Sequence, residues 1–377
     1  MQDGNFIREE KFQGKKASIK VIGVGGGGGN AINRMVQAGI EGVDFISVNT
    51  DAQDLKRNLA PYRVQIGENL TKGLGVGGDP DRGYKAAEES KEQIRQIVDG
   101  TDLLFVTAGM GGGTGTGAAP LITRIARDIG GNDTLIIGVV TRPFNFEGFI
   151  RLSQAEAGIK EMRKFVDTLL VIPNENLYSI IQRNTSTKQA YRMADEVLRQ
   201  AIQGISEVIT TPGDVNVDFN DVKRIMAQSG EALIGMGQAS GEKRHLEAAQ
   251  AAITSPMLEN AELEGAKGLI VHFLAKEHLA FEQKEVLDFI RTNASKDAII
   301  MYGLVEDETM GDDLKITVIA TGFPSDGSER RRHLKSRGQV PMTTDFANEQ
   351  PASAGAKYKT ESTENILVPA YIRKKKI

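Results

Sequence analysis

The chain contains no cysteine among its 377 residues. This absence excludes a disulfide framework, thiolate metal sites and cysteine nucleophiles, and it agrees with a reducing compartment. No apolar run approaches the roughly 20 residues that a membrane-spanning helix needs. Residues 1–16 carry charges of both signs and lack the apolar core of a secretory signal. We therefore expect a cytoplasmic protein.

A strong charge of one sign is also missing. The formal net charge is -4 at pH 7, which gives no overall attraction to nucleic acid or to an anionic membrane. The run Arg330–Arg332 lies in a mixed-charge stretch and is interpreted as solvated. The 4 histidines show no metal-ligand spacing, so we expect no metal site built by the protein alone.

The first half of the sequence alternates strand-like and helix-like patterns, which predicts a doubly wound, mostly parallel α/β sheet. Strands are expected at Ala17–Val24, Asp44–Val48, Asp102–Thr107, Thr134–Val140 and Thr168–Ile172, and helices at Asn30–Ala38, Tyr84–Val98, Thr116–Ile129 and Arg151–Phe165. A long helix at Lys188–Ile209 follows and ends before Thr211-Pro212-Gly213, a stop signal.

The second half predicts a smaller α+β domain. Its helices are expected at Asp221–Ala227, His245–Ile253 and Gln283–Ala294, and its strands at Gly268–Leu274, Ala298–Val305 and Leu314–Thr321. The predicted organisation is a flexible extension (1–16), a nucleotide-binding α/β domain (17–187), a central bridging helix (188–212), the α+β domain (213–323), a disordered linker (324–364) and a C-terminal partner-binding peptide (365–377). The linker is polar and has too few large apolar groups to offset the entropy of ordering.

Glycine is abundant, at 42 residues, and it clusters after predicted strands. The first cluster, Gly23-Val-Gly-Gly-Gly-Gly-Gly-Asn30, lies between a strand and a helix, where backbone N–H groups and the positive end of the helix can hold an anion. Taken alone it is ambiguous. It also fits G-x-G-x-x-G, typical of nicotinamide or flavin enzymes, and it could be a tight turn without a ligand.

A second cluster, Gly109-Met-Gly-Gly-Gly-Thr-Gly-Thr-Gly117, again follows a strand and precedes a helix. Two such turns in one sheet can place two helix N-termini around one phosphate chain, with threonine hydroxyls as further donors. No G-x-x-x-x-G-K-[ST] occurs, so this is no Walker loop and no lysine supplies the neutralising charge. The sequence therefore predicts a nucleotide site built mainly from backbone.

Two further segments belong to this prediction. The glycine-rich turn Gly73–Pro80 could close over the distal phosphate. Asn49-Thr-Asp51 ends the second strand, where ligands collect in such sheets. Asp51 is equally well explained as the N-cap of a following helix, and this alternative stays open.

Many ordered motifs together resemble one family. They are GVGGGGGN (23–30), VNTDAQ (48–53), TKGLGVGGDP (71–80), GGGTGTG (111–117), RPFNFEG (142–148), IPNENL (172–177) and NVDFNDVK (216–223). Their order and spacing resemble the tubulin/FtsZ family, and within it the bacterial cell-division members. The likeness runs from about Ser18 to Phe323, and the tail is similar to the family's C-terminal peptide. The resemblance implies a tubulin-like fold and a GTPase with GTP or GDP and Mg²⁺ as cofactors.

The resemblance also implies a role for individual residues. The residues implied to bind nucleotide are Gly26, Gly27, Gly28, Gly29, Asn30, Asn49, Asp51, Gly77, Gly78, Gly112, Gly113, Thr114, Gly115, Thr116, Glu147, Arg151, Asn174, Tyr191 and Asp195. Glu147 and Arg151 would hold the ribose and neighbouring groups, although their i, i+4 spacing also fits a solvated ion pair. Asn174 and Asp195 would recognise guanine, because a carboxylate accepts from N–H groups that adenine does not present alike. Tyr191 stands where the family usually has Phe and would stack on the base.

Catalysis is implied for Asn216, Asp218 and Asp221, in a loop that the family inserts into the nucleotide site of the next subunit. Their simpler interpretation is helix capping. The resemblance further implies head-to-tail self-assembly into a division ring at the septum, hydrolysis that requires assembly, and docking of membrane-tethering proteins such as FtsA on the C-terminal peptide. Contact with the membrane would thus be indirect. A nicotinamide-dependent oxidoreductase and a tubulin-like GTPase without a role in division remain alternatives.

Overall fold

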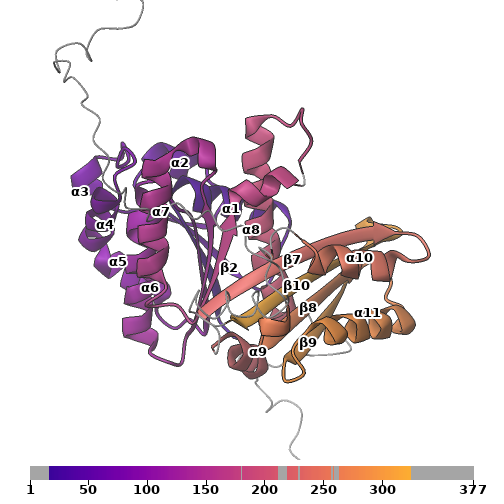
Figure 1. The fold of residues 1–377 in the computed structure, drawn as a ribbon. Helices are drawn as coiled ribbons and strands as arrows, with labels where there is room; N and C mark the ends of the chain where they lie inside the picture. The colour runs from indigo at the N-terminus through magenta and orange to yellow at the C-terminus, as the bar shows by residue number, and fades with distance from the viewer. Residues whose placement is uncertain are drawn as a thin grey trace, which may run out of the picture. The chain divides into compact units, whose positions relative to one another are not determined.

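The computed structural model describes residues 17–179, 181–210, 219–227, 230–255, 258 and 263–323, all within one folded unit (Figure 1). The predicted N-terminal extension, linker and C-terminal peptide lie outside the described residues. So do Asn216 and Asp218.

One ten-stranded sheet runs through the described part of the chain, in the order β3-β2-β1-β4-β5-β6-β7-β10-β8-β9. The strands are β1 (Ile19–Val24), β2 (Asp44–Asn49), β3 (Tyr62–Gln65), β4 (Leu103–Gly109), β5 (Leu135–Arg142), β6 (Thr168–Pro173), β7 (Gly230–Ser240), β8 (Gly268–Ala275), β9 (Ile299–Glu306) and β10 (Asp313–Phe323). Neighbours from β3 to β7 are parallel, β10 is antiparallel to both β7 and β8, and β8 is parallel to β9. The predicted mostly parallel sheet is therefore confirmed.

Helices cover both faces of the sheet. They are α1 (Gly25–Gln37), α2 (Ala52–Arg57), α3 (Glu68–Thr71), α4 (Pro80–Glu89), α5 (Lys91–Val98), α6 (Thr114–Gly130), α7 (Phe149–Met162), α8 (Thr187–Thr210), α9 (Phe219–Met226), α10 (Arg244–Ile253) and α11 (Ala280–Asn293). Along β1, Val21 packs in the cluster that contains α1 and α8, whereas Ile22 packs in the cluster that contains α4 to α7. Successive side chains of a strand point to opposite faces, so the parallel strands are buried on both sides.

The bounds of several predicted helices differ in the structure. α1 begins at Gly25 instead of Asn30, so the glycines of the first loop form the first turns of the helix. The predicted helix Tyr84–Val98 is two helices, α4 and α5, which meet at Ser90. The Ser90 hydroxyl accepts a hydrogen bond from the backbone N–H of Gly67 at 3.0 Å, which ties this break to the loop before α3. α9 begins at Phe219, two residues earlier than predicted.

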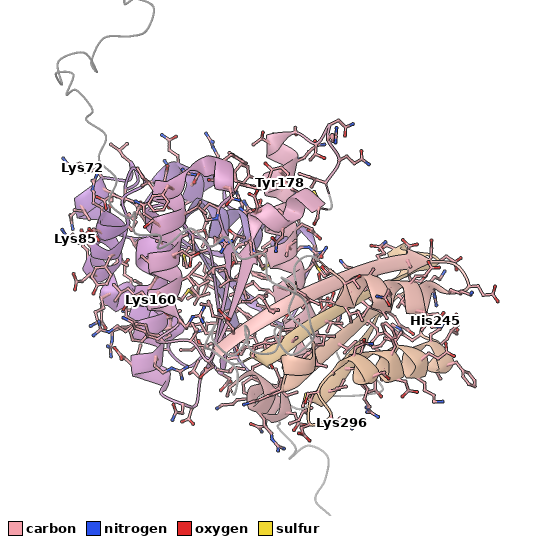
Figure 2. All side chains as sticks on the ribbon, in the orientation of Figure 1. Lys72, Lys85, Lys160, Tyr178, His245 and Lys296 are labelled. Carbon is pink, nitrogen blue, oxygen red and sulfur yellow. The ribbon has the colours of Figure 1, made fainter. Side chains whose placement is uncertain are left out.

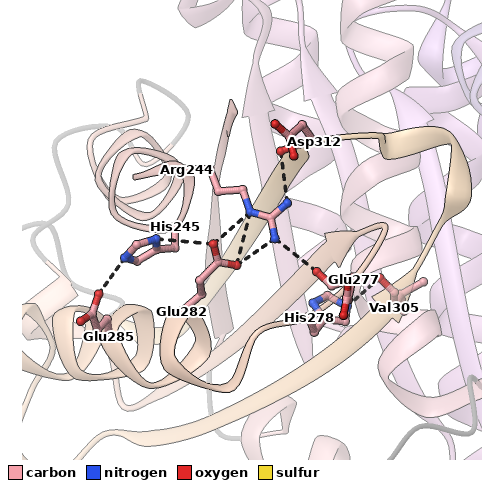
Figure 3. Close-up of polar contacts among 8 residues, drawn as sticks. All are labelled: Arg244, His245, Glu277, His278, Glu282, Glu285, Val305 and Asp312. Atoms are coloured by element: carbon pink, nitrogen blue, oxygen red, sulfur yellow. Dashed lines mark hydrogen bonds and ion pairs between the residues drawn. The ribbon is translucent and has the colours of Figure 1, made fainter. Parts of the chain in front are cut away.

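A charged cluster ties together the connections of the second half (Figure 3). Arg244 of α10 donates to the Glu282 carboxylate of α11 at 3.0 Å and to the backbone oxygens of Asp312 at 3.1 Å and Glu277 at 3.3 Å. His245 Nε2 lies 2.7 Å from Glu285 Oε2. Because Arg244 and Glu282 are nearly buried, this ion pair joins α10 to α11 and has a structural role. Within the described residues, no helix is both long and apolar enough to cross a bilayer.

Candidate nucleotide site

The candidate site lies at the carboxyl edge of the parallel strands, where β1, β2, β4, β5 and β6 end. Each of these strands is followed by one of the segments that the sequence singled out. Ligands of open parallel sheets bind at this edge, because the loops that follow the strands converge there. The structure thus brings the predicted segments to one edge, although they are distant in sequence.

The two glycine loops touch each other directly. A Cβ placed on Gly25 would lie 3.0 Å from the backbone nitrogen of Gly115, and one placed on Gly27 would lie 3.0 Å from the backbone nitrogen of Gly109. Gly25 also has φ +71°, a conformation that L side chains rarely adopt. The first turns of α1 and α6 are therefore neighbours, and their free N–H groups can act on the same anion.

The predicted glycines divide into two groups. Gly28 and Gly115 permit close packing, because a Cβ would lie 2.5 Å from the Thr107 carbonyl oxygen and 2.6 Å from the Gly109 carbonyl oxygen, respectively. Gly26 is exposed, and Gly112 has no heavy atom within 4 Å of a built Cβ. Of these four glycines, only the second pair presents open backbone to a ligand. The first group instead lets α1 and α6 approach their strands.

The two threonines of the second loop have different roles. The Thr114 hydroxyl lies 2.7 Å from the hydroxyl of Thr50, at the end of β2. The Thr116 hydroxyl is buried and accepts a hydrogen bond from the Gly111 N–H at 2.9 Å. The Thr116 oxygen therefore helps to shape the loop, while its own O–H remains a donor, so a contact of both hydroxyls with phosphate stays a prediction. Thr50, which is fully buried, was singled out only as part of the Asn49-Thr-Asp51 segment and given no role of its own.

The end of β2 is held by its own polar side chains. Asn49 Oδ1 accepts from the N–H of Thr50 at 2.8 Å, and Asn49 Nδ2 lies 3.5 Å from Asp54 Oδ2. Asp51 Oδ1 accepts from the N–H groups of Gln53 and Asp54, which makes it the N-cap of α2. The capping alternative for Asp51 is thus realised, and a ligand contact would have to use its second oxygen.

The third glycine turn lies beside the second loop. A Cβ on Gly113 would lie 2.5 Å from Val76 Cγ2 and 2.8 Å from the Asp79 nitrogen. Gly77 and Gly78 are exposed, have positive φ and have nothing within 4 Å of a built Cβ. The turn therefore adds open backbone next to α6.

Glu147 and Arg151 form the ion pair that their spacing allowed, with 2.5 Å between Glu147 Oε2 and Arg151 Nη1. The pair is not simply solvated, because the Glu147 side chain is 8% exposed while that of Arg151 is 54% exposed. Glu147 Oε1 accepts from the Phe144 N–H at 3.0 Å. The carboxylate is thus anchored to the backbone and presents the guanidinium to solvent.

An aromatic cluster surrounds Phe144, which is fully buried. Its ring centroid lies 5.1 Å from that of Phe146, 5.6 Å from Tyr178 and 5.4 Å from Tyr191. Figure 2 labels Tyr178 near the first turns of α8, the helix that carries Tyr191. Tyr191 is 38% exposed, so its ring is partly available for stacking.

Asn174 is buried and Asp195 is half-buried. Asn174 is 4% exposed, and its Oδ1 is buried without a hydrogen-bond partner. Burial raises the pKa of Asp195 to about 7, and the positive charge of Arg34 only partly opposes this shift. A buried acceptor without a donor is costly in a folded protein. These two side chains therefore fit a ligand that brings N–H donors, as the edge of guanine does.

Asp221 lies at the opposite edge of the sheet. It is exposed in the first turn of α9, whose Lys223 donates to the carbonyl oxygen of Asp133 at 2.9 Å. Asp133 precedes β5, whereas Glu147 follows it, so the eight residues of β5, roughly 26 Å, separate the two edges. In Figure 1, α2 lies at the top of the view and α9 at the bottom. Asp221 therefore does not join the other predicted site residues within one chain.

Comparison with known proteins agrees with this geometry. Residues 18–182 match the model of the Tubulin/FtsZ family, GTPase domain, and residues 230–324 match that of the FtsZ family, C-terminal domain. An FtsZ dimer from M. jannaschii is 42% identical, with a TM-score of 0.79 over 83% of this chain and 90% of that chain. CetZ2 from Haloferax volcanii, solved as a GTPγS-bound protofilament, shares the fold at 21% identity, with a TM-score of 0.68 over 86% of this chain and 100% of that chain. The chain belongs to the FtsZ family of tubulin-like GTPases.

Proposed function

We propose that this protein binds GTP across its two glycine loops and hydrolyses it as a subunit of a head-to-tail filament. The filament would form the division ring at the septum, on the cytoplasmic face of the membrane. The higher identity to FtsZ than to CetZ favours this role over that of a paralogue without a part in division. The match of the GTPase-domain model disfavours the nicotinamide-dependent alternative.

The observation that carries the proposal is the separation between Asp221 and the glycine loops. α8 alone has 24 residues, roughly 36 Å, and joins the edge that carries Tyr191 to the edge that leads to α9. An acidic group so placed cannot act on a nucleotide held by its own loops. Together with Asn216 and Asp218, Asp221 can act on the nucleotide of a second copy whose glycine loops face this edge.

Such a contact joins two different surfaces and is therefore heterologous. It generates an open filament unless the rotation between subunits closes a ring. The FtsZ of M. jannaschii was solved as a dimer, which supports self-association in the family. Hydrolysis would then depend on assembly, because each site would be complete only at a subunit contact.

The chain's own residues would divide the work of the reaction. The open backbone of Gly26 and Gly112 would bind phosphate oxygens, and Asp195 with Asn174 would orient guanine. Asp218 and Asp221 of the next copy would orient the attacking water. Within the described ranges no cluster of three acidic or histidine side chains could hold a metal, so Mg²⁺ would depend on phosphate oxygens and water. When bound, it would neutralise phosphate charge.

The test combines protein concentration with two variants. For the unmodified chain, we expect GTP turnover per subunit to rise steeply with concentration. Asp218→Ala and Asp221→Ala should retain GTP binding, lose nearly all turnover and form filaments that persist. An equal mixture of Asp221→Ala with Asp195→Ala should recover turnover, because some contacts would pair an intact nucleotide edge with an intact acidic loop. Turnover per subunit that does not change with concentration, or a mixture that stays inactive, would contradict the proposal.

We also propose that the C-terminal peptide (365–377) binds a membrane-tethering division protein such as FtsA. Its apolar residues Val368–Ile372 stand beside the basic run Arg373–Lys376, a composition that suits folding upon binding. A chain truncated after residue 364 should keep GTP turnover and filament formation but lose adaptor binding. Adaptor binding at full affinity by the truncated chain would refute this part.

A further inference from the structure

A cavity between α1 and the first turns of α8 has no part in the proposed function. Its lining residues are Arg34 of α1, Thr185 of the segment before α8, and Gln189, Arg192, Met193 and Glu196 of α8. Its volume of about 450 Å³ is typical of a small-molecule site. The four α8 residues recur at i, i+3, i+4 and i+7 and share one helix face, whereas Tyr191 and Asp195 lie on another. The cavity is therefore separate from the predicted base site.

Two guanidinium groups border this cavity without a partner. Arg34 is half-buried and Arg192 is exposed, and neither forms a hydrogen bond or an ion pair with another residue that the structure describes. Asp195 lies near enough to feel the charge of Arg34, but no ion pair joins the two side chains. An anion in the cavity would thus meet two positive charges that the fold leaves uncompensated.

Glu196, the carboxylate that lines the cavity, is already bound within α8. Its Oε2 accepts from Arg199 Nε at 2.9 Å, and its Oε1 accepts from Gln200 Nε2 at 2.6 Å. Arg199 therefore compensates its charge, and both of its oxygens have donors. Glu196 is thus not a counter-ion for Arg34 or Arg192.

The neutral polar side chains of the cavity have free donors and occupied acceptors. Gln189 Oε1 accepts from the backbone N–H of Ser186 at 2.8 Å and from the Ser186 hydroxyl at 2.9 Å, so its amide NH₂ is left to donate. Thr185 Oγ1 accepts from the Gln182 N–H at 3.1 Å, which leaves its O–H as a donor. Because a backbone N–H can only donate, these contacts decide which side-chain atom is the acceptor. The cavity therefore offers donors from three segments.

We propose that this cavity binds a small molecule that carries a phosphate group. Two guanidinium groups match the nearly two negative charges of a phosphate monoester, and its three terminal oxygens can accept from more donors than a carboxylate can. The N-terminus of α8 adds a positive partial charge at the same place. The cavity is larger than a phosphate ion, and Met193 offers apolar contact to the organic part of the ligand.

The test uses the full chain with its nucleotide site saturated with GDP, so that the probe cannot occupy the glycine loops. The probe is phenyl phosphate, and titration calorimetry at constant ionic strength measures its dissociation constant. We expect one molecule to bind per chain, with a dissociation constant of about 1 mM or tighter. Arg34→Gln and Arg192→Gln should each weaken binding about 10-fold or more, because a charge-assisted hydrogen bond is lost. Arg192 is exposed, so its replacement should leave the fold intact, which circular dichroism checks.

Arg183→Gln is the matched control. It removes the same charge from the segment before α8, but Arg183 is exposed and does not line the cavity, so the dissociation constant should stay within about twofold. Benzoate presents a carboxylate on the same ring and should bind at least about 10-fold more weakly than phenyl phosphate. Absence of phenyl phosphate binding, or an equal loss in all three variants, would overturn the proposal. Benzoate binding as tight as that of phenyl phosphate would also overturn it and would point to an acidic segment of a protein partner.

Discussion

The two edges of the parallel sheet use the same kinds of side chain in opposite ways. At the amino edge, Asp102 Oδ2 accepts from the Ser18 N–H at 2.8 Å, and Asp167 Oδ2 accepts from the Ile136 N–H at 2.8 Å. Asp167 also pairs with Arg127 at 2.7 Å. These carboxylates complete the hydrogen bonding of their own chain. Each of them therefore has a structural role.

At the carboxyl edge two side chains, Asn174 and Asp195, are left for a ligand. Asn174 Oδ1 has no partner, and burial raises the pKa of Asp195 toward neutrality. Burying polar groups without partners lowers the stability of the fold here, and the other edge avoids this loss. The difference shows that an acceptor left without a donor points to a ligand, whereas a carboxylate bound by its own chain, such as Asp51 or Glu147, does not by itself distinguish a site from a structural role. Asp221 is the exception at the amino edge, because it is exposed there.

The largest effect is expected for Asp195→Asn. Removing the carboxylate should weaken GTP binding on the order of 100- to 1,000-fold, because donors of the guanine edge would lose a charged acceptor. The free energy of unfolding of the nucleotide-free chain should stay unchanged or rise, since no buried charge remains. Titration calorimetry and urea unfolding measure the two quantities. A marked loss of stability would mean that Asp195 has a structural role, like the carboxylates of the amino edge.

A smaller effect is expected within the first glycine loop. Gly28→Ala should lower the free energy of unfolding by about 2 to 3 kcal/mol, because its Cβ would lie 2.5 Å from the Thr107 carbonyl oxygen. Gly26→Ala is the matched change, since its Cβ would meet only Asp54 Oδ2 at 3.4 Å. It should keep the stability and weaken nucleotide binding. Equal unfolding curves for the two variants would contradict the division into packing and open glycines.

For Asp167→Ala, at the amino edge, we expect a loss of stability without a loss of GTP binding. Loss of the ion pair with Arg127 and of the acceptor for Ile136 should lower the free energy of unfolding by about 1 to 2 kcal/mol. The dissociation constant for GTP should remain within about twofold, because the change is at the opposite edge from the glycine loops. A strong loss of GTP binding in a chain that is still folded would show that the two edges are coupled.

Much of the sheet could be predicted from the sequence, because its parallel strands are continuous apolar runs followed by glycine or polar clusters. β7 was missed because Gly235 and Gly237 interrupt its pattern. These glycines let α10 cross the strand, since a Cβ on Gly237 would lie 2.0 Å from the Ala248 carbonyl oxygen. β3 and α3 were missed because they are short, and α2 was foreseen only as the helix that Asp51 would cap. Local sequence shows neither the packing of a distant helix nor a four-residue strand.

The site was predicted mainly through the resemblance, and local chemistry alone left real ambiguity. Spacing could not show whether Asp51 caps a helix, and the structure shows that it does. Spacing also could not show that Thr116 is buried within its loop. That burial depends on how the loop folds, with the Gly111 N–H donating to the Thr116 hydroxyl. The burial of Asn174 was not visible in the sequence either. Such properties depend on contacts between segments far apart in the chain.

The smallest effect expected is the dependence of binding on pH. The pKa of Asp195 lies near 7 in the folded chain, above its ordinary value of 3.8, because burial disfavours the charge. The ionised fraction therefore falls about tenfold between pH 8 and pH 6, and the affinity for GTP should fall with it. The free energy of unfolding of the nucleotide-free chain should change in the opposite direction. It should fall as pH rises from 3.8 to 7, because ionisation of this group makes the fold less stable. Asp195→Asn is the control, because the phosphates of GTP titrate identically with both chains. If affinity changed with pH in the same way for both chains, Asp195 would have no part in base recognition.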